Sequence, residues 1–359
     1  MSILIGITFS EWKKLLAENN YRISPKYLPR LLPITMRSLM NSREEKKEVE
    51  AFAAQIRETK VEKAPVFILG HWRSGTTLLQ NYFSLDKQFA YPNLFQVYNP
   101  NSFLHLEPVV AEKLANAPAE KRPMDNVKVT SDSPAEDEFA LAILSRCSPL
   151  LAWVFPKRQE FYDRYLTMQD VSAEEITRWK NAFQLFVRKL TLKNKKQLIL
   201  KSPPHTCKIS LLLDMYPDAK FIHLYRNPFD VFKSTQRLYD STVPGFYLQK
   251  PKEKVVDTIL KNYSRMYDSF FQEKKLIKNQ NIIEQSYEEL AEDPVKQIRL
   301  IYEHLQLPGF EEFLPSLKRY VDSIANYKKN KYSSLSKDLK EKIVREWGRS
   351  FEEWGYKTE

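Results

Sequence analysis

The sequence predicts an α/β fold in which helices flank a parallel β-sheet, and two observations lead to this expectation. Three short apolar runs, residues 65–70, 197–201 and 220–225, have the length and composition of buried strands. Long stretches with helical periodicity separate these runs, and neighbouring parallel strands need such crossover connections. We therefore expect crossover helices to cover the sheet.

The first 60 residues are expected to form a basic, helical segment ahead of a single domain at residues 61–359. Residues 21–40 mix arginine and lysine with leucine, isoleucine, tyrosine and methionine, and three prolines interrupt them. One interpretation is an irregular segment packed on the core, and the other is a peripheral contact with a membrane surface. Residues 43–60 are rich in glutamate and lysine and predict a helix.

A large helical insertion is expected at about residues 90–195, after the first strand–helix unit. Within it, apolar residues recur with helical spacing from Ile176 to Leu190, which predicts one amphipathic helix. Residues 281–284 are a fourth and weaker strand candidate. Residues 335–354 predict a C-terminal amphipathic helix.

Composition and charge argue against several classes of protein. The 359 residues carry 56 Lys and Arg against 45 Asp and Glu, a net charge of +11. No run reaches the roughly 18 apolar residues that span a bilayer, because Arg146, Ser148 and Pro149 break residues 139–155. The apolar run Ile3–Phe9 follows no basic residue, so we expect no secretory signal.

Two cysteines, Cys147 and Cys207, are too few for a disulfide framework, and no Cys/His cluster has the spacing of metal ligands. We therefore expect a cytoplasmic protein without a metal ion. The basic residues follow no nucleic-acid-binding pattern. The excess charge is expected on solvated helix faces, or facing an anionic ligand or membrane, rather than on nucleic acid.

The segment from Gly70 to Thr77 follows the first strand and opens a helix, and its two glycines are spaced as in a Walker A loop. Glycines let the backbone turn tightly, its N–H groups point inward, and the helix N-terminus adds positive potential, so the loop suits an anion. The sheet is therefore expected to be P-loop-like. The residues expected to bind the anion are Arg73, Ser74, Gly75, Thr76, Thr77 and Leu78.

This loop lacks the lysine that reaches the β- and γ-phosphates of a nucleoside triphosphate, because Thr76 follows Gly75. Arg73 supplies a cation from inside the loop instead. Lys201 and Arg226 stand at strand ends, where a triphosphatase would place an acidic magnesium ligand. This pattern indicates phosphate chemistry without a metal ion, and a P-loop nucleotide kinase is the alternative.

A second anion-binding pattern begins where the third strand ends. Arg226 stands at that end, Pro228 opens the next helix, and Ser234 follows on the same helix. A guanidinium can fork onto a phosphate, and a serine hydroxyl can donate to the same group. Paired with the first loop, this pattern predicts a phosphate-binding site.

These motifs resemble those of the sulfotransferases that use 3′-phosphoadenosine 5′-phosphosulfate (PAPS). HWRSGTTLL at residues 71–79 is similar to their 5′-phosphosulfate loop, and YRNPFDVFKS at residues 225–234 is similar to their 3′-phosphate motif. Residues 287–294, YEELAEDP, resemble a family segment whose tyrosine contacts the adenine. The resemblance implies PAPS as the donor, 3′,5′-ADP as the product, and nucleotide contacts from Arg226, Ser234 and Tyr287.

KSPPH at residues 201–205 and EDEF at residues 136–139 resemble the bacterial small-molecule and lipid sulfotransferases more than the animal cytosolic enzymes. The chain lacks the Arg-Lys-Gly loop of the cytosolic enzymes. Residues 328–331, KKNK, stand at a similar place. They are either a 3′-phosphate contact or a solvated run of charge.

Sulfuryl transfer needs a general base and cations that hold the sulfuryl oxygens and the leaving phosphate. The resemblance implies Lys201 as the cation that bridges donor and sulfuryl group, and His205 as the base. A histidine near its ordinary pKa of about 6.5 suits proton abstraction. Glu136 or Asp137 is the rival base, acting alone or orienting the histidine. The leaving 5′-phosphate is expected to be held by Arg73, Thr76 and Thr77.

The helical insertion is expected to shape the pocket for a hydroxyl acceptor. Its aromatic residues belong either to the core or to this pocket: Phe95, Tyr98, Phe103, Phe139, Trp153 and Phe155. If they face the pocket, the acceptor is hydrophobic, such as a lipid or sterol-like alcohol, and a sugar or other polar metabolite is the alternative. His71 either touches sulfate or acceptor, or packs beside the loop. The oligomeric state stays open.

Overall fold

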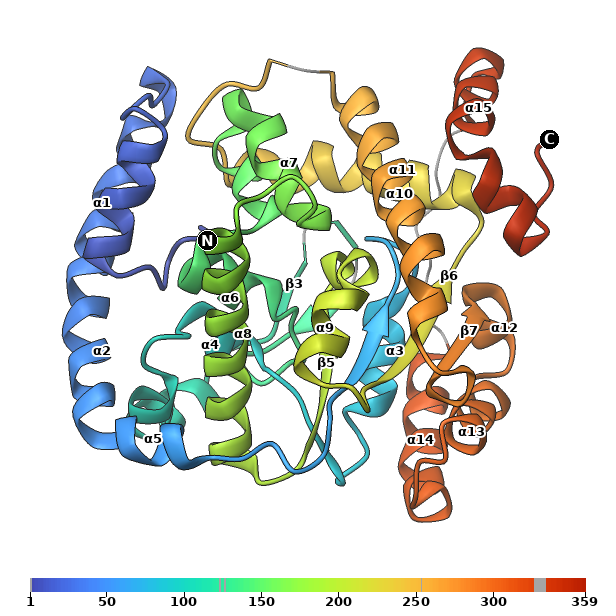
Figure 1. Ribbon diagram of the computed structural model, residues 1–359, viewed down its shortest axis with the longest axis horizontal. Coiled ribbons are helices and arrows are strands. Elements are labelled where there is room, and N and C mark those ends of the chain that lie inside the picture. Colours follow the sequence, from blue (N-terminus) through green and yellow to red (C-terminus); the bar gives the residue numbers. More distant parts are fainter. Residues whose placement is uncertain (1, 123, 126, 253, 326–333) are drawn as a thin grey trace. The chain divides into compact units, whose positions relative to one another are not determined.

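A computed structural model describes residues 2–122, 124–125, 127–252, 254–325 and 334–359 (Figure 1). The chain forms two compact units. The sheet unit comprises Lys63–Tyr91, Lys196–Tyr239 and Val255–Glu359. The helical unit comprises Met1–Glu62, Pro92–Lys195 and Asp240–Lys254.

Five parallel strands form the sheet of the sheet unit, in the order β2-β5-β1-β6-β7. Figure 1 labels β5, β6 and β7 of this sheet. Their bounds are Val66–Leu69 for β1, Phe89–Ala90 for β2, Gln197–Lys201 for β5, Lys220–Tyr225 for β6 and Ile282–Ser286 for β7. The predicted parallel sheet is confirmed, because β1, β5, β6 and β7 are the four apolar runs of the sequence. The sequence does not predict β2, since two edge residues are too few for a periodic pattern.

The register of the strands brings three chemically important chain segments to one edge of the sheet. β1 lies between β5 and β6, where Ile68 pairs with Lys201 and Leu69 pairs with His223. The carboxyl ends of these strands therefore lie side by side, and ligands of open α/β sheets bind at such an edge. Gly70 and Arg226 follow directly after β1 and β6.

Alternate side chains of β1 pack on opposite faces of the sheet, as the two-residue period of a strand requires. Val66 and Ile68 belong to a buried core that includes residues of the helices α3 (Thr76–Phe83), α12 (Tyr287–Glu292), α13 (Pro294–His304) and α14 (Phe310–Ile324). On the other side the Phe67 ring stacks on Phe221, with centroids 5.5 Å apart. Both faces are covered, which explains why these strands are apolar throughout.

The rest of the sheet unit is helical. The helices are α3 Thr76–Phe83, η4 Pro203–Cys207, α9 Ile209–Met215, α10 Pro228–Ser241, α11 Val255–Glu273, η6 Lys274–Leu276, η7 Asn279–Asn281, α12 Tyr287–Glu292, α13 Pro294–His304, α14 Phe310–Ile324 and α15 Lys337–Trp354. The predicted C-terminal helix is α15.

The helical unit contains the predicted insertion and a short antiparallel hairpin, β3 Glu120–Lys121 with β4 Lys128–Val129. Its helices are α1 Phe9–Glu18, η1 Pro25–Arg30, α2 Leu31–Glu58, α4 Leu94–Tyr98, α5 Phe103–Ala115, α6 Glu138–Ser145, η2 Pro149–Trp153, η3 Pro156–Arg158, α7 Gln159–Thr167, α8 Ala173–Asn194 and η5 Val243–Gly245. The predicted amphipathic stripe lies on α8, where Trp179, Phe183 and Leu190 are buried.

The N-terminal segment differs from the expectation of an irregular stretch over residues 21–40. η1 leads directly into α2, a continuous helix that begins at Leu31 rather than near residue 43. Pro33 does not break it, because the first-turn N–H groups of a helix have no partner within the helix. In the described part of the chain, no helix is both long and apolar enough to cross a membrane.

Candidate functional site

The loop after β1 needs glycine at two positions. Gly70 has φ +142° and Gly75 has φ +100°, a region that side-chain-bearing residues rarely adopt. A Cβ atom on Gly70 would lie 2.5 Å from the Leu224 carbonyl oxygen, and one on Gly75 would lie 2.3 Å from the Tyr287 ring. The loop therefore closes tightly against β6 and against the segment that follows β7.

Three hydrogen bonds fix the backbone of this loop. The Gly70 N–H donates to Thr206 Oγ1 at 2.8 Å, and the His71 N–H donates to the Tyr267 hydroxyl at 3.2 Å. Within the loop, the Ser74 N–H donates to the His71 carbonyl oxygen at 3.1 Å. Because these bonds come from η4, α11 and the loop itself, the loop geometry is set by the fold around it.

Residues of the three motifs that are predicted to bind the nucleotide come together at this loop. Arg73 Nε donates to Ser234 Oγ of α10 at 2.9 Å, and Ser234 is buried. Arg226 Nη1 makes a long hydrogen bond of 3.5 Å to the Arg73 carbonyl oxygen. The Arg226 guanidinium lies 4.4 Å from the centroid of the Tyr287 ring, and the same ring packs on Gly75.

The polar groups at the loop fit an anion. Ser74 is fully buried, and its Oγ has no hydrogen-bond partner among the residues that the structure describes. Arg226 Nε is likewise buried without a partner in the described ranges. Both groups can donate a hydrogen bond, and phosphate or sulfate oxygens accept such bonds. The positive end of α3 lies at the same place, where Thr76 is buried and Thr77 and Leu78 are half-buried.

Lys201 and His205 stand at the carboxyl end of β5. Lys201 is buried at the last position of that strand. His205 lies in η4, fully buried, and its ring packs edge-on against Phe67 with centroids 5.5 Å apart. Thr206, the next residue, accepts the hydrogen bond from Gly70. The bond from Gly70 to Thr206, the residue after KSPPH, and the pairing of Lys201 with Ile68 hold this segment beside the loop after β1, which we call the phosphate loop for its predicted role.

His71 is a packing residue in this structure. Its Nδ1 lies 2.8 Å from the Trp72 carbonyl oxygen, and its ring lies 5.0 Å from the Tyr263 ring. Burial lowers the pKa of His71 to about 4, although the hydrogen bond to Trp72 opposes this effect. His71 is therefore neutral near pH 7, and a neutral imidazole attracts an anion only weakly.

Glu288 is a residue of this site that the sequence motifs do not single out. One carboxylate oxygen accepts from the Asn227 N–H at 3.2 Å, and the other accepts from the Tyr356 hydroxyl at 2.6 Å. Glu288 thereby joins the start of α10 to the C-terminal residues, directly beside Tyr287. Its only signal in the sequence is its position in the YEEL segment, and Tyr356 carries no motif at all.

The rival base lies in the helical unit. Glu136 is half-buried just before α6, and the next two residues, Asp137 and Glu138, are fully buried. The Tyr98 and Phe139 rings are tilted toward each other with centroids 5.4 Å apart. Burial raises the pKa of Tyr98, and the charge of Glu136 raises it further, so the carboxylate lies near this aromatic pair.

The six aromatic residues of the insertion divide into two groups. Phe103, Trp153 and Phe155 are buried and belong to the core. The half-buried ones are Phe95, Tyr98 and Phe139. Residues 328–331 lie outside the described residues. In the described ranges, no group of three or more His, Cys, Asp or Glu side chains is arranged to hold a metal ion.

Two curated relatives cover nearly the whole chain. They are the omega-hydroxy-beta-dihydromenaquinone-9 sulfotransferases Stf3 of Mycobacterium bovis and Mycobacterium tuberculosis. Each is 32% identical over 353 residues, which cover 98% of this chain and 90% of the relative.

Two solved structures share the fold. Sulfotransferase STF9 from Mycobacterium avium has a TM-score of 0.67 and 17% identity, covering 94% of this chain and 88% of that one. Sulfotransferase STF1 from Mycobacterium tuberculosis H37Rv has a TM-score of 0.66 and 16% identity, covering 95% and 92%. They confirm the predicted P-loop-like fold. The pattern of the sulfotransferase family matches residues 65–312, from the start of β1 into α14. With the 32% identical relatives, this match shows that the chain belongs to the sulfotransferase family and is a sulfotransferase.

Proposed function

We propose that this sulfotransferase takes its sulfuryl group from PAPS and transfers it to a hydroxyl group of a hydrophobic, lipid-like acceptor. The observation that carries the proposal is the meeting of Arg73, Arg226 and Ser234 at one sheet edge. PAPS has phosphate groups on both the 5′ and the 3′ oxygens of one ribose, so its site needs two sets of cationic and hydroxyl donors close together. The phosphate loop supplies one set, and Arg226 with Ser234 supplies the other.

Tyr287 supports the same donor. Its ring is held between the Gly75 backbone and the Arg226 guanidinium. An aromatic ring fixed in this way offers a flat surface to an adenine base, and a neighbouring guanidinium adds a favourable charge. In this proposal Tyr287 contacts the adenine, while Glu288 holds the segment in place through its two hydrogen bonds.

The proposed chemical step is an in-line transfer. A base takes the proton of the acceptor hydroxyl, the oxygen forms a bond to sulfur, and the bond from sulfur to the 5′-phosphate oxygen breaks. The leaving 3′,5′-ADP gains negative charge, which Arg73, Thr76 and the N-terminus of α3 stabilise. Lys201, at the end of β5, neutralises charge on the bridging oxygen.

His205 is the proposed base, with Glu136 as the alternative. The His205 imidazole is closed off from solvent by its packing on Phe67. An acceptor hydroxyl must therefore reach His205 inside a water-poor site, which also protects PAPS from hydrolysis. Glu136 is half-buried beside Tyr98 and can accept a proton without this constraint.

Two observations support a lipid acceptor. The curated relatives are named for sulfation of an omega-hydroxylated dihydromenaquinone, a menaquinone-derived lipid. In this chain the rings of Tyr98 and Phe139 are half-buried next to the Glu136 carboxylate. Such a lipid resides in a membrane, so we also propose that residues 21–40 make a peripheral membrane contact.

The test is transfer of labelled sulfate from PAPS in an extract of bacterial lipids and soluble metabolites, with mass spectrometry of the products. We expect a sulfated, hydroxylated lipid and no product with Arg73→Ala. His205→Ala should lower kcat by a factor of about 10²–10⁴ without weakening the binding of 3′,5′-ADP. Glu136→Gln should leave kcat largely unchanged. Label found only in soluble sugars would contradict the lipid acceptor, and the reverse ranking of the two variants would make Glu136 the base.

A further inference from the structure

The helix α2 has an unusual distribution of side chains over its first four turns. Its inward face is mixed: Ile34, Ser38 and Asn41 are buried, and Asn41 Nδ2 donates to the carbonyl oxygens of Ile5 and Ile7. The outward face is apolar as far as Met40, and the exposed Arg43 follows on the same side of the helix. The exposed apolar residues of this face are Leu32, Met36, Leu39 and Met40, between 46% and 66% exposed.

These four residues form one stripe, since their positions fall within an arc of about 100° on a helix of 3.6 residues per turn. Leu28 of η1 and Tyr21 are exposed as well, so six of the eleven large apolar residues that are exposed in the described part of the chain lie within Tyr21–Met40. Single exposed apolar residues are ordinary, but a contiguous set of this kind marks an interaction surface. We call the four residues of α2, together with Leu28 and Tyr21, the apolar stripe.

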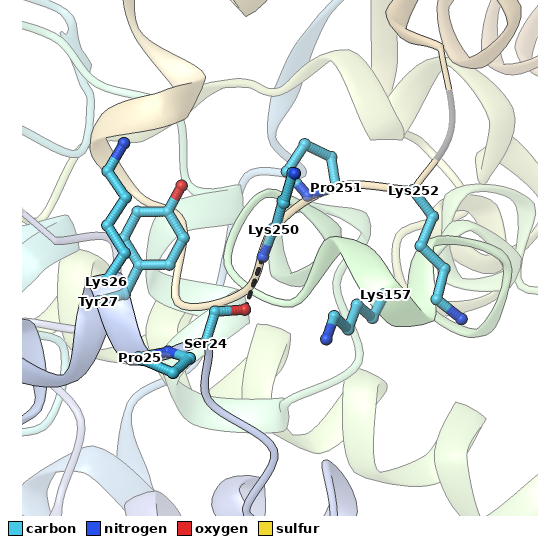
Figure 2. A pocket seen from close by; sticks show the side chains of 8 residues that line it. All are labelled: Ser24, Pro25, Lys26, Tyr27, Lys157, Lys250, Pro251 and Lys252. Atoms are coloured by element: carbon cyan, nitrogen blue, oxygen red, sulfur yellow. Dashed lines mark hydrogen bonds between the residues drawn. The ribbon is translucent and has the colours of Figure 1, made fainter.

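A basic groove adjoins the start of this segment. It has a volume of about 590 Å³ and is lined by Ser24, Pro25, Lys26, Tyr27, Lys157, Lys250, Pro251 and Lys252 (Figure 2). All four lysines are exposed. Within the described ranges, none of the four forms an ion pair, and no carboxylate lines the groove. The groove therefore presents four positive charges that no carboxylate of the described chain neutralises.

Several hydrogen bonds hold together the two chain segments that form most of the groove. The Lys250 N–H donates to Ser24 Oγ at 3.0 Å, the contact drawn in Figure 2, and Gln249 Nε2 donates to the Arg22 carbonyl oxygen at 2.6 Å. The Arg30 guanidinium donates to the carbonyl oxygens of Pro244, Gly245 and Tyr247 at 2.8–3.1 Å. These bonds clamp residues 22–30 to residues 244–250, all within the helical unit.

We propose that the groove and the apolar stripe together form a docking surface for a membrane with anionic phospholipids. The lysine groove holds phosphate-bearing headgroups, while Leu28, Leu32 and Met36 enter the boundary between headgroups and acyl chains. An exposed apolar helix face beside a lysine cluster is the pattern by which proteins lie on such surfaces. The charge of the groove selects this occupant over a neutral apolar partner. The inference deepens the peripheral membrane contact proposed above for residues 21–40 and rests on that part of the proposed function, whereas binding to a membrane needs neither donor nor acceptor.

The test is co-sedimentation of the full chain with two kinds of vesicle, phosphatidylcholine alone and phosphatidylcholine mixed with phosphatidylglycerol. We expect binding to the anionic vesicles, weak binding to the neutral ones, and release at about 1 M salt, where screening acts within roughly 3 Å. The double variant Lys250→Glu/Lys252→Glu should lower the partition coefficient for anionic vesicles by roughly two orders of magnitude. Leu32→Gln/Met36→Gln should lower it by at least roughly tenfold.

Two matched control variants distinguish binding at the docking surface from general effects of net charge and exposed apolar area. Lys113→Glu/Lys337→Glu changes the net charge by the same amount at exposed sites outside the groove. Val109→Gln/Leu300→Gln removes exposed apolar side chains elsewhere. Both should change the partition coefficient by less than about threefold. Since every substituted side chain is exposed, all variants should unfold at the wild-type temperature.

Three results would overturn the docking surface: no binding to anionic vesicles, equal loss in the control variants, or a dimer in ultracentrifugation that Leu32→Gln/Met36→Gln dissociates. The last would show that a second copy covers the stripe. Binding of 3′,5′-ADP, measured in the same samples, keeps the two proposals apart. A protein that binds the nucleotide but no vesicle fails only the membrane surface, and the opposite outcome fails only the donor assignment.

Discussion

Contacts within the protein hold the Arg73 side chain in one orientation. Its backbone has φ +71°, in the left-handed region, at a cost of roughly 1–2 kcal/mol for a residue other than glycine. Its Nε is bonded to Ser234, so the guanidinium is fixed relative to α10. Backbone strain that persists in a fold is often found where a side chain must be aimed, and the phosphate loop is such a place.

Replacing Arg73 by lysine should show the value of this orientation. Arg73→Lys keeps the charge but loses the bond from Nε to Ser234, and we expect kcat with PAPS to fall by a factor of about 10²–10³. Steady-state kinetics measure this, with Arg237→Lys as the control, because that variant makes the same chemical change at an exposed position of α10. Equal kinetics for the two variants would remove Arg73 from the proposed role.

Because His71 is buried, we expect the free energy of unfolding to rise with pH. Its pKa is lowered to about 4 in the folded chain, below the ordinary value of 6.5. Between these two values the unfolded chain binds a proton that the folded chain does not, so stability rises with pH. The contribution is fully present above pH 6.5 and is lost as the pH falls toward 4, a change of about 3 kcal/mol.

Urea unfolding at a series of pH values measures this effect. Compared with the wild type, His71→Gln should show a flatter curve between pH 4 and 6.5, whatever its stability at neutral pH. The comparison removes the part due to His223, whose pKa burial also lowers and which is present in both proteins. Parallel curves for the two proteins would mean that His71 is not buried in its neutral form.

At the scale of elements, α11 contacts the phosphate loop and α15 packs on α11. Tyr267 of α11 accepts the hydrogen bond from the His71 N–H. The Trp347 ring of α15 stacks on Tyr263 of α11, with centroids 3.7 Å apart, and its Nε1 donates to the Leu260 carbonyl oxygen at 3.1 Å. The C-terminal helix thus stabilises the helix that positions the loop.

Trp347 should therefore matter for stability through its ring more than through its N–H group. Trp347→Ala removes a fully buried side chain, and we expect the free energy of unfolding to fall by about 3–5 kcal/mol. Trp347→Phe keeps most of the stacking and should cost markedly less. Urea unfolding measures both, and an equal cost for the two variants would contradict the importance of the stack.

At the scale of the whole molecule, much of the sheet unit follows from the sequence because few arrangements satisfy it. Four apolar runs with crossover helices allow only a parallel sheet, and parallel strands place their carboxyl ends at a shared edge. The motifs at those strand ends therefore predict that Arg73, Lys201 and Arg226 lie in one region. The hydrogen bond from Arg73 to Ser234 is not among these predictions, because the sequence patterns assign the two residues to different phosphates.

Other features depend on contacts that no local pattern encodes. The packing of Tyr287 on Gly75 requires β7 to lie beside β6, and a sequence does not state the order of strands. The bond from Tyr356 to Glu288 joins residues 68 positions apart, and Tyr356 belongs to no motif. The start of α2 is hard to predict because Pro25, Pro29 and Pro33 lie close to it, and the effect of a proline depends on where a helix begins.

The central claim is that the phosphate loop, Arg226 and Ser234 form one site for a nucleotide with both 5′ and 3′ phosphates. Calorimetric titration of the protein with 3′,5′-ADP and with 5′-AMP, without a divalent metal, tests it most directly. We predict that the wild type binds 3′,5′-ADP tighter by a factor of about 10–100, and that Ser234→Ala and Arg226→Lys each reduce this ratio. Equal affinity for the two nucleotides, or binding of ATP–Mg²⁺ alone, would contradict the claim.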